Sequence, residues 1–162
     1  MKRIFSFFIC IALALSLCSC GESVNMSVLT EYQKRDFEAE LKIKSEGKER
    51  ICSLTKKDGR FFLCIRGLDG FTFVFDENGA GIISGGAEIP FGSAPLPVYE
   101  LYRIFTIPAM GTWKIEKSRP GGVSLYVCEG DGITLYIDAL SHLPLKIISG
   151  GMEADVLSFK VK

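Results

Sequence analysis

Phe71-Thr72-Phe73-Val74-Phe75 is the stretch of sequence that decides the fold. Its three phenylalanines alternate with Thr72 and Val74, so in an extended chain the three rings lie on one side of a strand. Three aromatic rings on one face need a cover, because exposed apolar area is unfavourable. Either a packed helix or a bound apolar molecule supplies that cover, and which of the two does so is the functional question.

The same alternation recurs along the chain. Phe37, Ala39, Leu41 and Ile43 alternate with charged residues, which predicts a strand with one solvent-exposed face and one buried face. Turn signals such as Asp58-Gly59 separate the apolar runs, and no long helical crossover interrupts the first six runs. We therefore expect ten or eleven short strands joined as an antiparallel meander.

A helical pattern interrupts the meander. Val98, Leu101, Tyr102 and Phe105 fall at positions i, i+3, i+4 and i+7, which predicts an amphipathic helix over residues 98–106 after an exposed loop at 90–97. A helix this short is stabilised by what it packs on, so we expect it to cover the aromatic face of the sheet. Residues 26–35 form either a second short helix or an extended tether. The fold class is α+β, mainly β.

The second half of the chain contains a predicted hairpin, and each of its two strands has one apolar face. Strands are expected at 123–128 and 133–138, on either side of the turn Glu129-Gly130-Asp131-Gly132. The alternation places Val123, Leu125 and Val127 on one face, and Ile133, Leu135 and Ile137 on one face. Closing strands are expected at 143–148 and 155–161.

The N-terminus has the anatomy of a secretory signal peptide. Met1-Lys2-Arg3 is basic, and the apolar run from Ile4 to Leu17 is shorter than the ~20 residues that a membrane-spanning helix needs. Leu17-Cys18-Ser19-Cys20 resembles the lipobox of bacterial lipoproteins. The resemblance implies that Cys20 receives a diacylglycerol on its sulfur and becomes the new N-terminus. The alternative is an ordinary cleaved signal or an uncleaved anchor.

This interpretation divides the chain into residues 1–19 as lipoprotein signal peptide, 20–27 as tether and 28–162 as the folded domain. Cleavage removes Lys2 and Arg3, which leaves 17 basic residues against 19 acidic ones, a net charge of −2. Because nucleic-acid binding calls for a basic stripe, we expect no nucleic-acid partner. Basic residues are dense between Lys42 and Arg66; a solvated outer face is favoured over contact with anionic headgroups.

Three cysteines remain once the leader is removed and Cys20 is acylated. A three-residue loop at Lys57-Asp58-Gly59 places Cys52 opposite Cys64 and allows a disulfide, whereas a two-residue Asp58-Gly59 loop puts them on opposite faces and forbids it. Buried free thiols are the more ordinary interpretation. The sequence has a single histidine and no CxxC motif, so we expect no metal and no cofactor.

No residue pattern indicates catalysis. Asp131 lies in a hairpin turn, Asp138 ends a strand where its carboxylate is expected to cap the following turn, and His142 lies in that turn. No serine is placed at a strand-to-helix elbow with a base partner. We therefore expect that the protein is not an enzyme.

Two segments carry a resemblance to a known family. Residues 70–79 (Gly-Phe-Thr-Phe-Val-Phe-Asp-Glu-Asn-Gly) and residues 135–147, with Leu-Tyr-Ile-Asp followed by Leu-Pro-Leu-Lys-Ile, resemble the LolA/LolB superfamily of lipoprotein carriers and receptors. The resemblance extends over about residues 28–162. It implies a single curved antiparallel sheet, an unclosed half-barrel, whose concave side is covered by one or two lid helices above a hydrophobic cavity for acyl chains.

We therefore expect a lipoprotein held by Cys20 on the outer face of the cytoplasmic membrane or on the outer membrane. It would bind an acyl chain, a lipid or a lipoprotein in a hydrophobic cavity, with a role in lipid or lipoprotein trafficking. The alternative is a non-enzymatic structural or adaptor lipoprotein with a filled core and a protein partner. The residues expected to line the cavity are Phe61, Leu63, Phe71, Phe73, Phe75, Leu101, Phe105, Trp113, Leu125, Leu135 and Leu145.

Overall fold

Short turns between alternating apolar runs fold the chain back on itself repeatedly. The computed structural model describes residues 24–91, 96–106 and 111–162; residues 1–23, which include Cys20, and the segments 92–95 and 107–110 lie outside them. The strands are β1 (Phe37–Ser45), β2 (Lys48–Lys57), β3 (Arg60–Ile65), β4 (Phe71–Asp76), β5 (Gly79–Ser84), β6 (Ala87–Phe91), β7 (Lys114–Ser118), β8 (Leu125–Gly130), β9 (Ile133–Asp138), β10 (Pro144–Ser149) and β11 (Met152–Val161).

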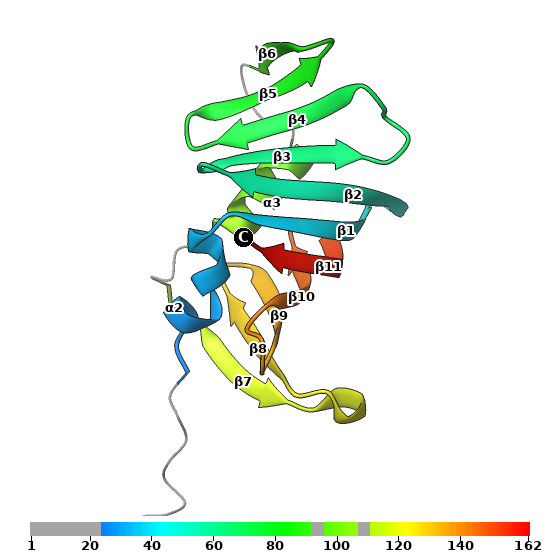
Figure 1. The fold of residues 1–162 in the computed structure, drawn as a ribbon. Coiled ribbons are helices and arrows are strands. Elements are labelled where there is room, and N and C mark those ends of the chain that lie inside the picture. The colour runs from blue at the N-terminus through cyan, green and yellow to red at the C-terminus, as the bar shows by residue number, and fades with distance from the viewer. Residues whose placement is uncertain (1–23, 92–95, 107–110) are drawn as a thin grey trace, which may run out of the picture.

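All eleven strands belong to one sheet, in the order β6-β5-β4-β3-β2-β1-β11-β10-β9-β8-β7, and every neighbouring pair is antiparallel. The first and last strands of the meander, β1 and β11, pair in the middle of the sheet, while β6 and β7 are its two edges (Figure 1). The sheet is curved and does not close. The prediction of a single open antiparallel sheet is confirmed.

The helices are short. α3 (Leu96–Phe105) lies behind the sheet in Figure 1, against the concave face. α2 (Met26–Leu29) is capped by the Asn25 side chain, which accepts a hydrogen bond from the Val28 amide at 3.1 Å, and the 3-10 helix η1 (Glu31–Lys34) follows it. Met26, assigned to the tether in the sequence analysis, is buried in the core.

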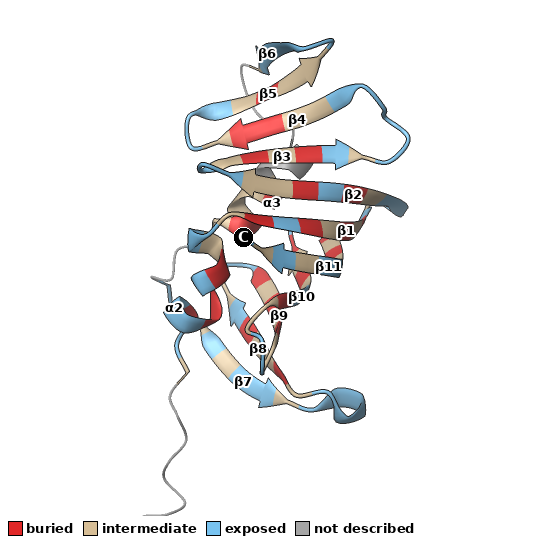
Figure 2. Cartoon of the chain, viewed as in Figure 1, coloured by how far each residue is buried: buried red, intermediate tan, exposed pale blue. Residues whose placement is uncertain are grey.

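Alternation along the strands separates two faces. On the concave face, the buried positions of β1 meet those of β2, β11 and β9 beneath α3, and Figure 2 shows buried and more exposed positions alternating along these strands. The buried residues of the described part of the chain, from Met26 to Ala154, form one hydrophobic core.

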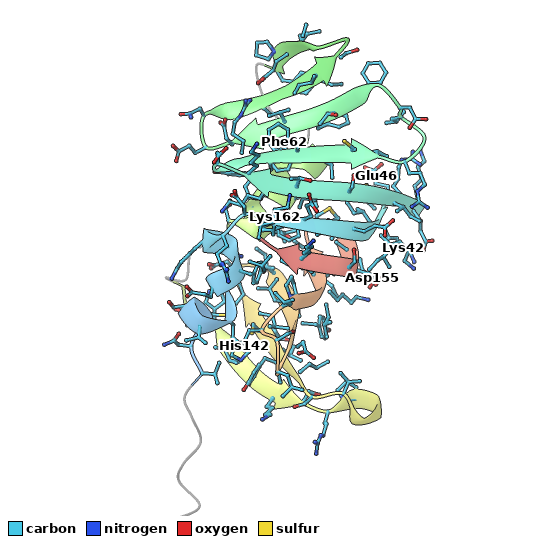
Figure 3. The ribbon with its side chains drawn as sticks, viewed as in Figure 1. Lys42, Glu46, Phe62, His142, Asp155 and Lys162 are labelled. Carbon is cyan, nitrogen blue, oxygen red and sulfur yellow. The ribbon has the colours of Figure 1, made fainter. Side chains whose placement is uncertain are left out.

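The convex face is charged and paired. Arg66 contacts Glu40 at 2.9 Å, and Lys42 contacts Asp155 at 3.6 Å across the β1–β11 pair; Figure 3 shows the latter two side by side. Exposed pairs of this kind contribute little to stability.

Two-residue turns set the register and decide several residue assignments. Lys57 pairs with Arg60, so the loop is Asp58-Gly59, with both residues at positive φ (51° and 79°). Cys52 consequently pairs with Ile65 rather than with Cys64, and the two thiols lie on opposite faces. All three described cysteines are free.

The expectation that Leu125 lies with Leu135 on the covered face is wrong. The Asp131-Gly132 turn pairs Gly130 with Ile133, which puts Cys128 opposite Leu135. Tyr126 and Cys128 therefore lie on the core face, whereas Leu125 pairs with Asp138 on the other face. Val123 precedes the strand and is exposed.

Two further residues expected on the covered face are exposed. Phe71 lies beyond Leu63↔Phe73, the last pair between β3 and β4, so its ring has no neighbour on that side and is 45% exposed. Leu145 occupies a bulge, where the register of β10 against β9 shifts, and is 38% exposed.

Both ends of the expected loop at 90–97 belong to regular elements, and residues 92–95 lie outside the described residues. Pro90 belongs to β6, and this is compatible with a strand because β6 is an edge and has no further neighbour to receive an N–H. α3 begins two residues before the predicted start, with Pro97 in its first turn, where its missing N–H is tolerated.

Candidate ligand-binding pocket

A pocket opens on the concave face beside α3, at the end of the sheet where β1 turns into β2. Its volume is about 310 Å³, within the range of small-ligand sites. Glu46, at the right-hand side of Figure 3, marks this end of the hairpin. The lining residues come from β1, β2, β3, β11, α3 and the β1–β2 turn: Ile43, Ser45, Glu46, Lys48, Arg50, Cys52, Leu63, Ile65, Leu101 and Met152.

The β1–β2 turn brings these residues together. Glu46 and Gly47 form a two-residue turn with φ of 51° and 74°, and Ser45 pairs with Lys48. Directly paired residues share a face, so Arg50 lies beside Ile43 on the concave side. In this register the apolar residues of the concave face are followed, at the β1–β2 end, by two cationic residues, Lys48 and Arg50.

The floor of the pocket is apolar and buried. Cys52, Leu63, Leu101 and Met152 are each at most 3% exposed. Burial raises the pKa of the Cys52 thiol to about 11, so the group is neutral at physiological pH and acts as a small apolar side chain. The exposed side chains of Glu46, Lys48 and Arg50 form the rim.

α3 forms one wall and is fixed to the sheet by a polar cluster. The Ser149 hydroxyl, almost fully buried, donates to Oε2 of Glu100 at 2.8 Å. Arg103 donates from its Nη2 to the Asp131 carbonyl at 3.0 Å and to the Ser149 oxygen at 3.4 Å. These bonds tie α3 to β10 and to the β8–β9 turn, while Leu101 faces the pocket.

Most of the concave face away from the pocket is packed. The rings of Phe61 and Phe75 stack with centroids 5.3 Å apart, and Tyr102 of α3 meets both edge-on, at 5.8 and 6.1 Å. Phe105 packs at 5.6 Å from Phe37. These aromatic contacts fill the space that a larger cavity would occupy.

The residues proposed from the sequence therefore lie in different parts of the structure. Leu63 and Leu101 line the pocket. Phe61, Phe75, Phe105 and Leu135 are buried in the core, and Phe73 and Trp113 pack against it partly buried. Leu125 is buried on the opposite face, and Phe71 and Leu145 are exposed. Cys20 lies outside the described residues.

Sequence reasoning missed the pocket residues Ile43, Lys48, Arg50, Cys52 and Met152 as a group. A signal for the first four was available: following the alternation of β1 through a two-residue Glu46-Gly47 turn puts all four on the concave face. The β10–β11 turn places Met152 in the pocket, and the sequence does not determine how β10 and β11 pair.

The turn after β9 has a structural role. Oδ1 of Asp138 accepts hydrogen bonds from the amides of Leu140 and Ser141 at 3.1 and 2.7 Å and from the Ser141 hydroxyl at 2.8 Å. The expected capping by Asp138 is thus confirmed. His142 and Tyr32 line a second pocket, of about 290 Å³, near α2 (Figure 3), and the ring of His142 lies 6.2 Å from that of Tyr126.

The described residues contain neither a cluster of metal-ligating side chains nor a helix that could span a membrane. Within residues 24–91, 96–106 and 111–162, no three histidine, cysteine or acidic side chains are grouped so that they could hold a metal ion. No helix in the same part of the chain is long and apolar enough to cross a membrane.

The sequence matches no protein-family model and no curated protein. Among solved structures, an uncharacterized conserved protein from Thermus thermophilus matches with a TM-score of 0.57 and 14% identity, over 85% of each chain. A MucA/MucB complex of Pseudomonas aeruginosa matches with a TM-score of 0.44 and 18% identity, over 82% of this chain and 54% of the matched one. A DUF1329 family protein from Desulfovibrio piger matches with a TM-score of 0.47 and 10% identity, over 85% of this chain and 92% of the matched one.

At these identities the likeness concerns the fold alone. The single open antiparallel sheet of eleven strands with short helices is the architecture that the sequence predicted.

Proposed function

We propose that the protein is a membrane-anchored extracytoplasmic lipoprotein that binds an apolar ligand, an acyl chain or a lipoprotein, in the pocket beside α3. The observation that carries this proposal is the apolar floor of a 310 Å³ pocket on the concave face. An apolar ligand there would be removed from water against Cys52, Leu63, Leu101 and Met152, and burial of apolar area is the driving force. The proposed role is passive, in lipid or lipoprotein trafficking.

The anchor is proposed from the lipobox at Cys20. Acyl chains contribute about 0.8 kcal/mol per buried methylene, so a diacylglycerol would hold the domain next to a bilayer. Cys20→Ser is expected to release the protein from washed membranes in the cell, whereas the wild type stays attached. Continued tight attachment of the Cys20→Ser variant would contradict acylation at this residue.

Native mass spectrometry of the non-lipidated protein beginning at Gly21 tests ligand binding. We expect the purified protein to retain a fatty acid or phospholipid. Ile65→Trp places a large ring in the pocket wall and should abolish retention, and Ile51→Trp makes the same change on the opposite face of the sheet as a control. A wild-type protein that carries no lipid and takes up none would overturn the proposal.

A second candidate is a structural or adaptor lipoprotein that binds a protein partner. The packing of Phe61, Phe75 and Tyr102 favours it, because these rings leave no room for a ligand over the central part of the concave face. A lipid-free protein in the same mass-spectrometry experiment would support this candidate.

A further inference from the structure

Three cations of β2 lie on the concave face instead of the charged convex face. The pairs Ser45↔Lys48, Ile43↔Arg50 and Phe37↔Lys56 place them there. Lys56 is already engaged, since its ammonium donates to the Gln33 carbonyl and lies 5.7 Å from the centre of the Phe61 ring. Lys48 and Arg50 lie at the other end of the strand, on the rim of the pocket.

Neither of these two rim cations has an acidic partner within 4.0 Å among the described residues, although Arg60, Arg66 and Lys146 on the convex face all do. Glu46 also lines the pocket, so the rim carries two positive charges and one negative charge. Below the rim, the floor is wholly apolar. The pocket therefore presents a positive entrance above an apolar interior.

From this arrangement we infer that the ligand is a single-chain fatty acid, with its carboxylate at Lys48 and Arg50 and its chain directed toward Leu101 and Met152. The inference rests on the proposed function and specifies its ligand. A volume of 310 Å³ corresponds to roughly ten water-sized groups at about 30 Å³ each, which suits part of one chain and not the two chains of a phospholipid. The two cations supply the charge complementarity that orients the carboxylate.

The test is isothermal titration calorimetry of the non-lipidated protein beginning at Gly21, whose domain has its own core. Four amphiphiles of equal chain length serve as probes: decanoate, decyl phosphate, decan-1-ol and decyltrimethylammonium. We expect decanoate to bind most tightly, decan-1-ol at least about fivefold more weakly, and the cation most weakly. Raising the salt concentration should weaken the binding of decanoate and leave that of decan-1-ol unchanged.

Matched variants locate the carboxylate. Lys48→Met and Arg50→Gln should each weaken decanoate binding about fivefold and leave decan-1-ol unaffected. Lys44→Met is the control, because it removes the same charge from the convex face of the same hairpin. Circular dichroism verifies that the three exposed substitutions leave the sheet folded.

The outcomes separate this inference from the proposed function. Equal binding of decanoate and decan-1-ol, with no effect of Lys48→Met or Arg50→Gln, would leave an apolar site in place and overturn the fatty-acid assignment. Tighter binding of decyl phosphate than of decanoate would overturn it too, in favour of a phosphate headgroup. Failure of all four probes to bind would overturn both.

Discussion

Replacing Phe75 by alanine tests whether the aromatic face is a packed core. Phe75 is 2% exposed, stacks on Phe61 at 5.3 Å and meets Tyr102 of α3 at 6.1 Å. Truncating a buried phenylalanine typically costs about 3–5 kcal/mol, and lost aromatic pairs contribute to that value. We expect Phe75→Ala to lower the free energy of unfolding by about 4 kcal/mol.

Phe71→Ala is the matched control, since it makes the same change four residues earlier on the same face of β4. Its ring is 45% exposed, so we expect a loss below about 1 kcal/mol. The assay is urea unfolding followed by the fluorescence of Trp113, the single tryptophan, which packs against the core.

A loss of less than about 1 kcal/mol for Phe75→Ala, or a loss no greater than that of Phe71→Ala, would contradict a packed aromatic core. Such a result would mean that the concave face is open beneath α3 and that the observed stacking contributes nothing. It would also enlarge the space available to a ligand far beyond the pocket at the β1–β2 end.

Three other perturbations test separate features. Iodoacetamide should label Cys64, which is exposed, and should not label Cys128 until urea unfolds the domain, because burial raises the pKa of the Cys128 thiol to about 11. Equal labelling of the two cysteines in the folded protein, measured by peptide mapping, would contradict the register of β8. Asp138→Ala should cost about 1 kcal/mol at pH 7. Hydrogen bonds from the amide and hydroxyl of Ser141 lower the pKa of Asp138 from 3.8, so the contribution of the carboxylate to stability is present above pH 3.8 and is lost as the pH falls through the folded-state pKa. The unfolding free energies of the wild type and Asp138→Ala should therefore converge between pH 7 and pH 2. A difference that stays constant over this range would show that the ionised carboxylate is not the stabilising group. Ser149→Ala should lower the urea midpoint by an amount equivalent to about 1–2 kcal/mol, because it leaves the Glu100 carboxylate without its buried donor, and an unchanged midpoint would show that the cluster does not fix α3.

The sheet was predictable because its signal is repeated along the chain. Alternation in residues 37–43 and 71–75, with glycine-containing turns between strands, suffices to predict an antiparallel meander, and the i, i+3, i+4, i+7 pattern suffices for α3. These signals depend on neighbouring residues only, so they can be read without knowledge of the partner strand.

Face assignments depended on the turns and were less predictable. A loop that is one residue shorter or longer reverses every side chain of the following strand, as the Asp58-Gly59 turn does for Cys64. Leu145 was misplaced by a bulge, which alternation cannot reveal. The rim cations were overlooked because a basic residue in a strand is ordinarily assigned to solvent, whereas Arg50 lies opposite Ile43 on the concave side.

The edges of the open sheet have a consequence for how copies of the protein coexist. Any unclosed sheet ends in two rows of backbone amides and carbonyls that another chain could extend. Here Pro90 deprives the β6 border of a donor, and the opposite border, β7, presents Lys114, Glu116 and Lys117 to solvent. Both devices oppose the addition of a twelfth strand, so crowding these domains together on a surface should leave them separate instead of joining them into fibrils.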